Sequence, residues 1–451
     1  MVDTIAAVST SLSVGAISII RISGNQAINI TNKIFKGKDL TKVDSHTINY
    51  GHIVDNNIII DEVLVSIMKA PKTFTKEDVV EINCHGGIST TNKILELLLN
   101  NGCRLAEPGE FTKRAFLNGR IDLIEAESVM DLINSKTEIT RKMAINGVEG
   151  KISSLIKSLR NDIIEILANI EVNIDYPEYE DAIEITNNIL SKKLIHIKEE
   201  INKILKKSEN TKIMKDGITI GIFGSPNVGK SSILNALLEE EKAIVTDIKG
   251  TTRDIVEGSF MLNGITINII DTAGIRTTND IVEKIGVEKS KKTLENVDLV
   301  IIVLNNNEKL SNDDIELINN TKDKKRIILI NKNDLETKLD KEQLKDLDII
   351  TSNTISNNGL DNLKNKIIEM FNLGQIDDKD LTYLSSARSI SLLKQCVNII
   401  NDIDISIENE IPVDMIQIDL KNIWDILGEI IGESYSDELL DQLFTQFCLG
   451  K

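Results

Sequence analysis

The chain has 451 residues, of which 41% are hydrophobic and only 3% aromatic, and its formal net charge at pH 7 is −18. This length exceeds that of one compact domain, so we expect two or three domains whose cores rest on Ile, Leu and Val. A chain this acidic is not a general binder of polyanions, so any contact with nucleic acid must be local or be made mostly by a partner.

No run of residues is apolar enough to span a membrane and no signal peptide is evident, which predicts a cytoplasmic protein without a membrane partner. The chain contains 4 cysteines, widely spaced and without a C-x-x-C pair. This spacing argues against a zinc site and against a disulfide framework.

Predicted strands and helices alternate over residues 1–118. Strands are expected over 14–22 and 79–83, helices over 25–35 and 90–99, and a hairpin over 47–68 with its turn at Asn56-Asn57. This alternation predicts a small α+β domain.

Long amphipathic helices are predicted on both sides of the middle of the chain. Apolar residues recur at spacings of three and four over 121–133, 152–174 and 190–205, and again over 383–401, 415–431 and 436–448. Ser436 is a good N-cap for the last of these helices. We therefore predict that residues 119–215 and 374–451 form one discontinuous all-α domain, into which a domain of residues 216–373 is inserted.

The most specific motif of the chain is GSPNVGKS at residues 224–231, which fits the phosphate-loop pattern G-x-x-x-x-G-K-[ST]. An apolar strand is predicted before it and a helix after it, so backbone N–H groups and a helix N-terminus would surround a phosphate. Lys230 then reaches the outer phosphates and the Ser231 hydroxyl ligates Mg²⁺. The alternative is a chance match in an ordinary glycine turn, which the flanking strand and helix disfavour.

Three further motifs follow in the order that a guanine-nucleotide domain needs. In the sequence GTTRD, Thr252 can supply a second Mg²⁺ ligand. In the sequence DTAG, Asp271 can hold the Mg²⁺ shell through water, and the N–H of Gly274 can meet the γ-phosphate. The sequence NKND selects guanine, because the carboxylate of Asp334 pairs in a bidentate way with two donors that adenine lacks. Together the four motifs predict GTP as the substrate.

Ile275 follows DTAG at the position where many small GTPases have a glutamine that orients the attacking water. Isoleucine cannot hydrogen-bond to water, and no arginine finger is evident, so two other residues are candidates. Asn227 can ligate a monovalent cation that replaces the missing arginine charge. Glu283 can reach the water directly or through a second water. For both residues an ordinary polar surface position is the alternative, and the residues alone leave this open.

Over essentially its full length the chain resembles the MnmE (TrmE) family of tRNA modification GTPases. The resemblance rests on motifs in every part of the chain: DTIAA at 3–7, IRISG at 20–24, FTKEDVVE at 74–81, HGG at 85–87, PGEFTKRAFLNG at 108–119, GTTRD at 250–254, DTAGIR at 271–276 and FCLGK at 447–451. It implies an α/β P-loop GTPase domain inserted in a discontinuous all-α domain, preceded by an α+β folate-binding-like N-terminal domain.

The resemblance also implies a homodimer that works with the FAD-dependent partner MnmG (GidA) in a heterotetramer or larger complex. Together they would add a carboxymethylaminomethyl or aminomethyl group to carbon 5 of the wobble uridine of certain tRNAs. A formyl- or methylene-tetrahydrofolate would supply the carbon, and glycine or ammonium the nitrogen.

The resemblance assigns roles to residues of both predicted sites. Folate would be bound by Arg21, Glu81, Arg120 and Lys451. K⁺ would be held by Asn227, Thr246, Ile248 and Thr251, and Mg²⁺ by Ser231 and Thr252. The catalytic candidates are Glu283, Lys230 and Cys448; by itself, the cysteine would be read as a small packed hydrophobe. The GTP-binding set is Asn227, Val228, Gly229, Lys230, Ser231, Ser232, Thr246, Asp247, Ile248, Lys249, Gly250, Thr251, Thr252, Asp271, Thr272, Ala273, Gly274, Asn331, Lys332 and Asp334.

The chain departs from the family pattern at three places. Residues 9–14 lack the usual proline and glycines, and Arg120 stands where lysine is common, which keeps the charge but changes the geometry. Ser352-Asn353-Thr354 replaces the usual Ser-Ala motif that backs the guanine base.

Two other classes of GTPase compete with this interpretation. A ribosome-assembly or RNA-binding GTPase predicts an appended basic module, and the acidic balance of the chain argues against one. A membrane-remodelling GTPase predicts an exposed basic or apolar lipid-facing segment. Neither feature is visible in the sequence.

Overall fold

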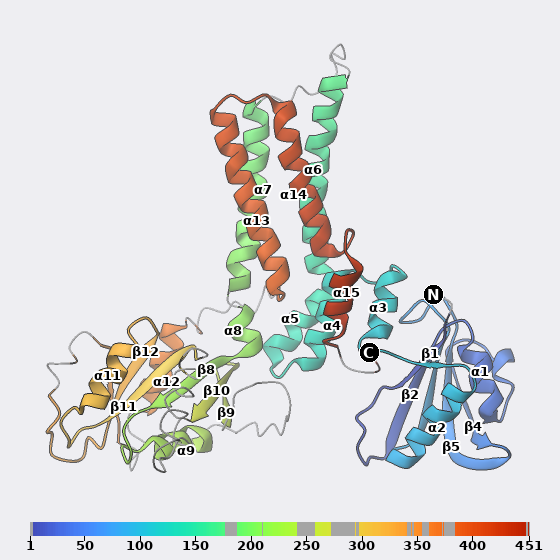
Figure 1. The fold of residues 1–451 in the computed structure, drawn as a ribbon, viewed down its shortest axis with the longest axis horizontal. Helices are drawn as coiled ribbons and strands as arrows, with labels where there is room; N and C mark the ends of the chain where they lie inside the picture. The colour runs from blue at the N-terminus through green and yellow to red at the C-terminus, as the bar shows by residue number, and fades with distance from the viewer. Residues whose placement is uncertain are drawn as a thin grey trace. The chain divides into compact units, whose positions relative to one another are not determined.

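A computed structural model of the protein shows two compact units (Figure 1). Unit 1 comprises Met1–Ile133, Ala144–Leu205 and Ser386–Lys451, and unit 2 comprises Asn134–Met143 and Lys206–Ser385. None of the described helices is long and apolar enough to cross a membrane. The structure describes residues 3–175, 187–209, 211–240, 258–271, 294, 297–340, 344, 347–353, 360–371, 373, 384–447 and 450.

Unit 1 contains a seven-stranded sheet of order β3-β4-β5-β6-β2-β1-β7, in which β1 and β7 are parallel and the other neighbours are antiparallel. Side chains alternate between its faces, and one face packs on helices α1 and α2 through Ile20, Ile22, Val65 and Ile82. The elements are β1 Ile5–Val8, β2 Ile17–Ser23, α1 Ala27–Ile34, β3 Phe35–Lys36, β4 Thr47–Asp55, β5 Ile58–Met68, β6 Val79–His85, α2 Ile88–Asn100 and β7 Arg104–Leu105.

The predicted hairpin is confirmed, with Asn56 and Asn57 between β4 and β5 at φ values of 47° and 69°. Two consecutive residues with positive φ are what the favoured two-residue hairpin turn requires, and asparagine tolerates that conformation.

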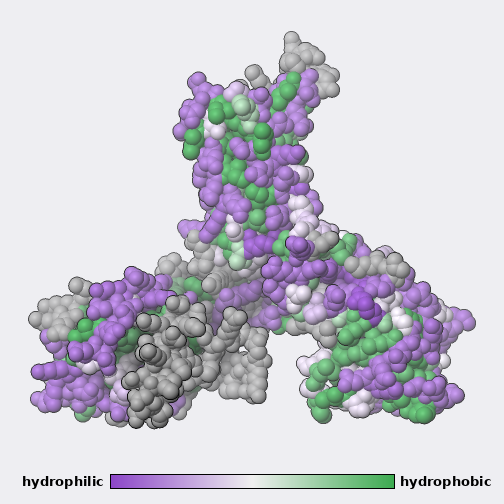
Figure 2. All heavy atoms as spheres, viewed as in Figure 1, coloured by the Kyte–Doolittle hydropathy of each residue, from purple (hydrophilic) through white to green (hydrophobic). Residues whose placement is uncertain are grey.

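The opposite face of this sheet is only partly covered. Ile17, Ile48, Tyr50 and Leu64 are 64%, 69%, 61% and 47% exposed. Figure 2 shows hydrophobic residues gathered on the surface of the N-terminal part of unit 1. An exposed apolar surface of this kind commonly marks an interaction site.

The rest of unit 1 is helical, and four long helices, α6, α7, α13 and α14, run side by side (Figure 1). Helix α6 buries Ile156, Leu159, Ile163 and Ile170, the stripe that the periodicity predicts. Since α13 and α14 follow unit 2 in the sequence, the predicted discontinuous all-α domain is confirmed. The helices are α3 Glu110–Leu117, α4 Leu123–Asn134, α5 Glu138–Val148, α6 Lys151–Asp175, α7 Asn187–Glu209, α13 Ala387–Glu408, α14 Val413–Ile431 and α15 Asp437–Phe444. The first half of α5 and the last residues of α7 belong to unit 2.

Unit 2 contains a six-stranded sheet of order β13-β12-β11-β8-β10-β9, parallel except for β9. Strand β8 is flanked by β10 and β11, so the strand order reverses beside it, and open α/β sheets bind ligands beyond the carboxyl ends of their strands at such a point. The elements are α8 Thr211–Asp216, β8 Ile218–Phe223, α9 Lys230–Glu240, β9 Gly258–Leu262, β10 Ile265–Asp271, β11 Leu299–Asn305, α11 Asn312–Asn320, β12 Arg326–Asn331, β13 Ile349–Thr351 and α12 Leu360–Met370.

Candidate functional site

The turn at residues 224–229 connects the central strand β8 to helix α9, which begins at Lys230. Its backbone is left-handed at Gly224, Asn227 and Gly229, with φ values of 145°, 65° and 100°. A Cβ atom at Gly224 would lie 2.4 Å from the Val303 carbonyl oxygen, so a side chain there is excluded. A glycine-rich turn that runs into a helix N-terminus is an anion-binding site.

The phosphate loop is held by contacts within unit 2. Lys230 Nζ donates to the carbonyl oxygens of Gly224 (2.8 Å) and Ser225 (2.9 Å), so the ammonium lies over the loop. Ser225 Oγ donates to Asp314 Oδ1 at 3.0 Å, and Asp314 forms the capping box of α11 with Ser311. These contacts place a positive charge where phosphate oxygens would be bound.

Other candidates surround the same loop. The side chain of Val228 is buried, whereas Asn227, Ser231 and Ser232 are exposed. An exposed amide and two exposed hydroxyls at the start of α9 are oxygen ligands of the kind that hard cations take.

The NKND segment begins at the end of β12 and is joined directly to the phosphate loop. Asn331 is 1% exposed and its Nδ2 donates to the Val228 carbonyl oxygen at 2.9 Å. Lys332 has a φ of 58°, and the N–H of Leu335 donates to its carbonyl oxygen at 3.0 Å, which closes a turn. Asp334 lies exposed in this turn. The structure thus brings the loop at residues 224–229 and the NKND segment to the same edge of the sheet.

The remaining nucleotide-site candidates lie outside the described residues, and so do two candidates near the C-terminus. Of Asp271, the structure describes only the backbone, at the end of β10. The others are Thr246, Asp247, Ile248, Lys249, Gly250, Thr251, Thr252, Thr272, Ala273, Gly274, Glu283, Cys448 and Lys451.

In unit 1, Arg21 on β2 and Glu81 on β6 lie opposite each other. Arg21 Nε and Nη2 lie 2.9 and 2.8 Å from Glu81 Oε1, and both side chains remain partly exposed. Gly450 reaches the same place, because its carbonyl oxygen accepts from Arg21 Nη1 at 3.2 Å and from Ser9 Oγ at 3.1 Å. The last turn of the described chain therefore adjoins the Arg21–Glu81 pair.

Arg120 borders the apolar cluster of Ile5, Ala7, Ala106, Phe111 and Phe74. Its guanidinium lies 4.8 Å from the centre of the Phe74 ring, and that of Arg21 lies 5.7 Å from the centre of the Phe111 ring. Two cations next to aromatic rings suit a ligand with a flat ring and an anionic group.

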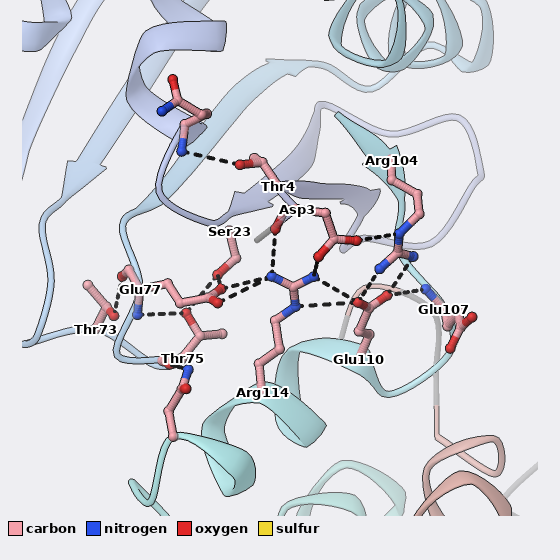
Figure 3. Close-up of polar contacts among 12 residues, drawn as sticks. Asp3, Thr4, Ser23, Thr73, Thr75, Glu77, Arg104, Glu107, Glu110 and Arg114 are labelled. Atoms are coloured by element: carbon pink, nitrogen blue, oxygen red, sulfur yellow. Dashed lines mark hydrogen bonds and ion pairs between the residues drawn. The ribbon is translucent and has the colours of Figure 1, made fainter. Parts of the chain in front are cut away.

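The sequence did not assign a role to Arg114, which is completely buried and lies at the centre of a group of polar contacts (Figure 3). Its guanidinium contacts Asp3 Oδ1 at 2.9 Å, Glu110 Oε1 at 2.9 Å and Glu77 Oε2 at 3.2 Å. Arg104 contacts Asp3 at 2.7 Å and Glu110 at 2.5 Å. This five-residue network joins the start of β1, the segment before β6, β7 and α3.

Two carboxylates of the network, Asp3 and Glu110, have lowered pKa values. The hydrogen bond from Arg104 lowers the pKa of Asp3. Burial alone would raise the pKa of Glu110, but hydrogen bonds from Arg104, from the Glu107 N–H and from Arg114 hold it below its ordinary value. The buried Arg114 charge is therefore compensated by carboxylates.

A second pair that sequence reasoning did not find lies at the end of β6. His85 Nδ1 is 2.7 Å from Asp61 Oδ1, and the His85 N–H donates to Asp61 Oδ2 at 2.8 Å. The hydrogen bond to Asp61 raises the pKa of the exposed His85 imidazole. No spacing in the sequence signals this pair, because its members come from two strands.

Comparisons with known proteins agree along the whole chain. The family model described as GTP-binding protein TrmE N-terminus matches residues 4–120, and the MnmE helical domain model matches residues 123–448. A protein named tRNA modification GTPase MnmE from Bacillus mycoides (strain KBAB4) is 56% identical over 100% of this chain and 99% of its own. One of the same name from Bacillus anthracis is 55% identical with the same coverage. The G domain of the T. maritima FeoB iron transporter aligns with 35% of this chain and 99% of its own, at 28% identity and a TM-score of 0.26.

Proposed function

The chain belongs to the MnmE family of tRNA modification GTPases, and from this premise we propose that its GTP hydrolysis depends on K⁺ and serves one reaction. With an FAD-dependent partner, it adds a carboxymethylaminomethyl or aminomethyl group to carbon 5 of the wobble uridine of certain tRNAs. The main support for GTP binding at this site is the hydrogen bond between Asn331 and the Val228 carbonyl oxygen, because it holds the phosphate loop and the NKND segment together.

In the proposed nucleotide site, Lys230 releases its two loop carbonyls and binds the outer phosphates of GTP. Ser231 and Thr252 hold Mg²⁺, which usually keeps only one or two protein ligands beside phosphate oxygens and water. The exposed hydroxyl of Ser231 at the start of α9 fits this ligand set. Asp334 pairs with the N–H and amino edge of guanine.

We assign K⁺ binding to Asn227, together with Thr246, Ile248 and Thr251. Asn227 supports this assignment because its side chain is exposed within the phosphate loop and its backbone adopts a positive φ of 65°. A cation held there would supply the positive charge that an arginine finger supplies in other GTPases. Glu283 would orient the attacking water.

A folate site in unit 1 is the second part of the proposal. Glu81 can accept hydrogen bonds from a pterin edge, while Arg21 and Arg120 suit a ring oxygen or a glutamyl tail. The adjoining position of Gly450 supports roles for Cys448 and Lys451 at the same place. The proposed domains are residues 1–118 for folate binding and dimerisation, 119–215 and 374–451 for the helices, and 216–373 for GTP.

The proposal includes a homodimer and a complex with MnmG and tRNA in the cytoplasm. The exposed apolar residues Ile17, Ile48, Tyr50 and Leu64 support a homodimer through the N-terminal sheet, since their burial against a second copy would be favourable. Tetrahydrofolate, K⁺ and Mg²⁺ would be bound by this chain, and FAD by the partner.

Replacing Na⁺ by K⁺ at equal ionic strength should raise the GTP hydrolysis rate of the purified protein by about tenfold or more. Asn227→Ala should lose this activation, because the amide oxygen that holds the cation is gone. Hydrolysis is measured as phosphate release, and GDP binding to the variant serves as the control for an intact site. Equal rates in both salts would show that the catalytic charge comes from elsewhere, with Arg253 and Arg276 the first residues to test.

A strain without this protein should lack the carboxymethylaminomethyl and aminomethyl groups on wobble uridine, and the wild-type gene should restore them. Mass spectrometry of tRNA nucleosides measures both. Normal modification together with a ribosome-assembly defect would instead support the ribosome-assembly class of GTPase.

A further inference from the structure

We infer that Asn306 is a positioning residue for guanine specificity, which holds the segment carrying the base-selecting carboxylate at its working position. Asn306 follows β11 directly and is completely buried. The inference rests on the proposed role of Asp334 in guanine binding and adds to it the residue on which that role depends.

The backbone of Asn306 is hydrogen-bonded to the chain on both sides of the turn that carries Asp334. Its N–H donates to the Asn331 carbonyl oxygen at 3.0 Å, just before the turn at Lys332. Its carbonyl oxygen accepts from the N–H groups of Lys338 and Leu339 at 2.9 and 3.2 Å, just after that turn. The backbone of Asn306 thereby holds residues 331 and 338–339, which flank the turn with Asp334.

The side chain of Asn306 holds the residues that directly follow the NKND segment. Nδ2 donates to the Leu335 carbonyl oxygen and to Thr337 Oγ1, both at 3.1 Å. Leu335 directly follows Asp334, and its N–H closes the turn on Lys332. The amide therefore fixes the peptide immediately after the base-selecting carboxylate.

The chemistry of the contacts requires an amide at this position. The Leu335 carbonyl can only accept, so Nδ2 and not Oδ1 must face it, and an isosteric aspartate would present an acceptor to an acceptor. Oδ1 is buried and accepts no hydrogen bond from any residue that the structure describes. Leaving a buried acceptor unsatisfied is unfavourable, which indicates that the two bonds of Nδ2 decide the orientation.

The neighbouring Asn305 offers a matched control. It is 6% exposed and lies at the end of the same strand, but its Nδ2 donates to Glu308 Oε1 at 2.8 Å. Its Oδ1 faces the N–H of Asn307. Its side chain contacts thus remain within residues 305–308 and do not reach residues 331–339.

The test compares the dissociation constants of GDP and IDP, because IDP lacks the 2-amino group that pairs with Asp334. For the wild-type chain we expect tighter GDP binding. In Asn306→Ala and Asn306→Asp the dissociation constant of GDP should rise about tenfold, and that of IDP should rise less, so the preference shrinks. The value of kcat at saturating GTP should stay within a factor of about three, because the phosphate loop is not changed.

Asn305→Ala should keep the GDP-to-IDP preference of the wild-type chain. Thr337→Val removes one of the two oxygen atoms that accept from Asn306 Nδ2, at an exposed residue. It should reduce the preference for GDP over IDP by a smaller factor than the Asn306 variants do. It therefore tests the inference even if the Asn306 variants do not fold. An unchanged preference in the folded Asn306 variants and in Thr337→Val, or an equal loss in Asn305→Ala, would overturn the inference. A wild-type chain that does not prefer GDP would instead contradict the proposed role of Asp334 itself.

Discussion

Replacing Arg114 by methionine is expected to lower the free energy of unfolding of unit 1 by about 3–5 kcal/mol, the cost typical of removing one partner from a buried ion network. Arg114 is fully buried among Asp3, Glu77 and Glu110. Methionine fills much of the space of the arginine side chain. It removes the positive charge that offsets the carboxylates of Glu77 and Glu110, which lie in a poorly hydrated part of the protein. Urea unfolding followed by circular dichroism measures the change.

The control for Arg114→Met is Lys151→Met in the same unit. Lys151 forms an ion pair with Glu149, and the two side chains are 53% and 55% exposed. Water screens such a pair, so its loss should hardly change stability. Adding Glu77→Gln to Arg114→Met should recover part of the loss, because it neutralises a carboxylate that has lost its ion pair with Arg114, whereas Glu110 keeps Arg104 at 2.5 Å. A loss for Arg114→Met no larger than that for Lys151→Met would contradict a stabilising role for the network.

Replacing Lys230 by alanine is expected to reduce GTP hydrolysis at least about 100-fold, since it removes the only side-chain charge of the phosphate loop from the transferring phosphoryl group. In the structure this ammonium lies over the loop, bound to the carbonyl oxygens of Gly224 and Ser225. Affinity for GTP should fall as well, because the same charge binds the ground state. Single-turnover hydrolysis and nucleotide titration separate the two effects.

Lys322→Ala is the matched control for Lys230→Ala, because Lys322 is an exposed lysine of unit 2 that precedes β12. It lies in the turn between α11 and β12, before that strand begins, whereas the phosphate loop follows the end of β8 and the NKND segment starts at the end of β12. Its removal should leave hydrolysis unchanged. A rate for Lys230→Ala within a factor of about ten of the wild-type rate would contradict the proposed phosphate contact.

The features that the sequence predicts well depend on neighbours in the chain. The phosphate loop needs glycines and a lysine at fixed spacing, and the hairpin at Asn56-Asn57 needs two residues that tolerate positive φ. Both requirements are local, so both are visible as motifs. The helical stripes of α6 and α14 follow for the same reason, because their period is a property of one segment.

The features that the sequence did not reveal depend on residues far apart in the chain. Arg114 meets Asp3 across 111 positions and Glu77 across 37. Neither charge sign nor spacing identifies such partners, because any of the 70 acidic residues is a possible partner. The proposed role of Asn306 cannot be predicted from the sequence, because it depends on which oxygen atoms its amide contacts at the edge of the folded sheet.

The hydrogen bond from the Leu384 N–H to Ser208 Oγ, 3.1 Å long and buried, has a consequence for polymer entropy. It pins together the two ends of a loop of about 175 residues, and closing a flexible loop of that length costs on the order of 4 kcal/mol. The entropy of closing this loop is lost when the residues between Ser208 and Leu384 fold. Once residues 209–383 have folded, the end of α7 and the start of α13 are held close together. The effective concentration of α6 and α7 relative to α13 and α14 is then high, which favours formation of the four-helix bundle.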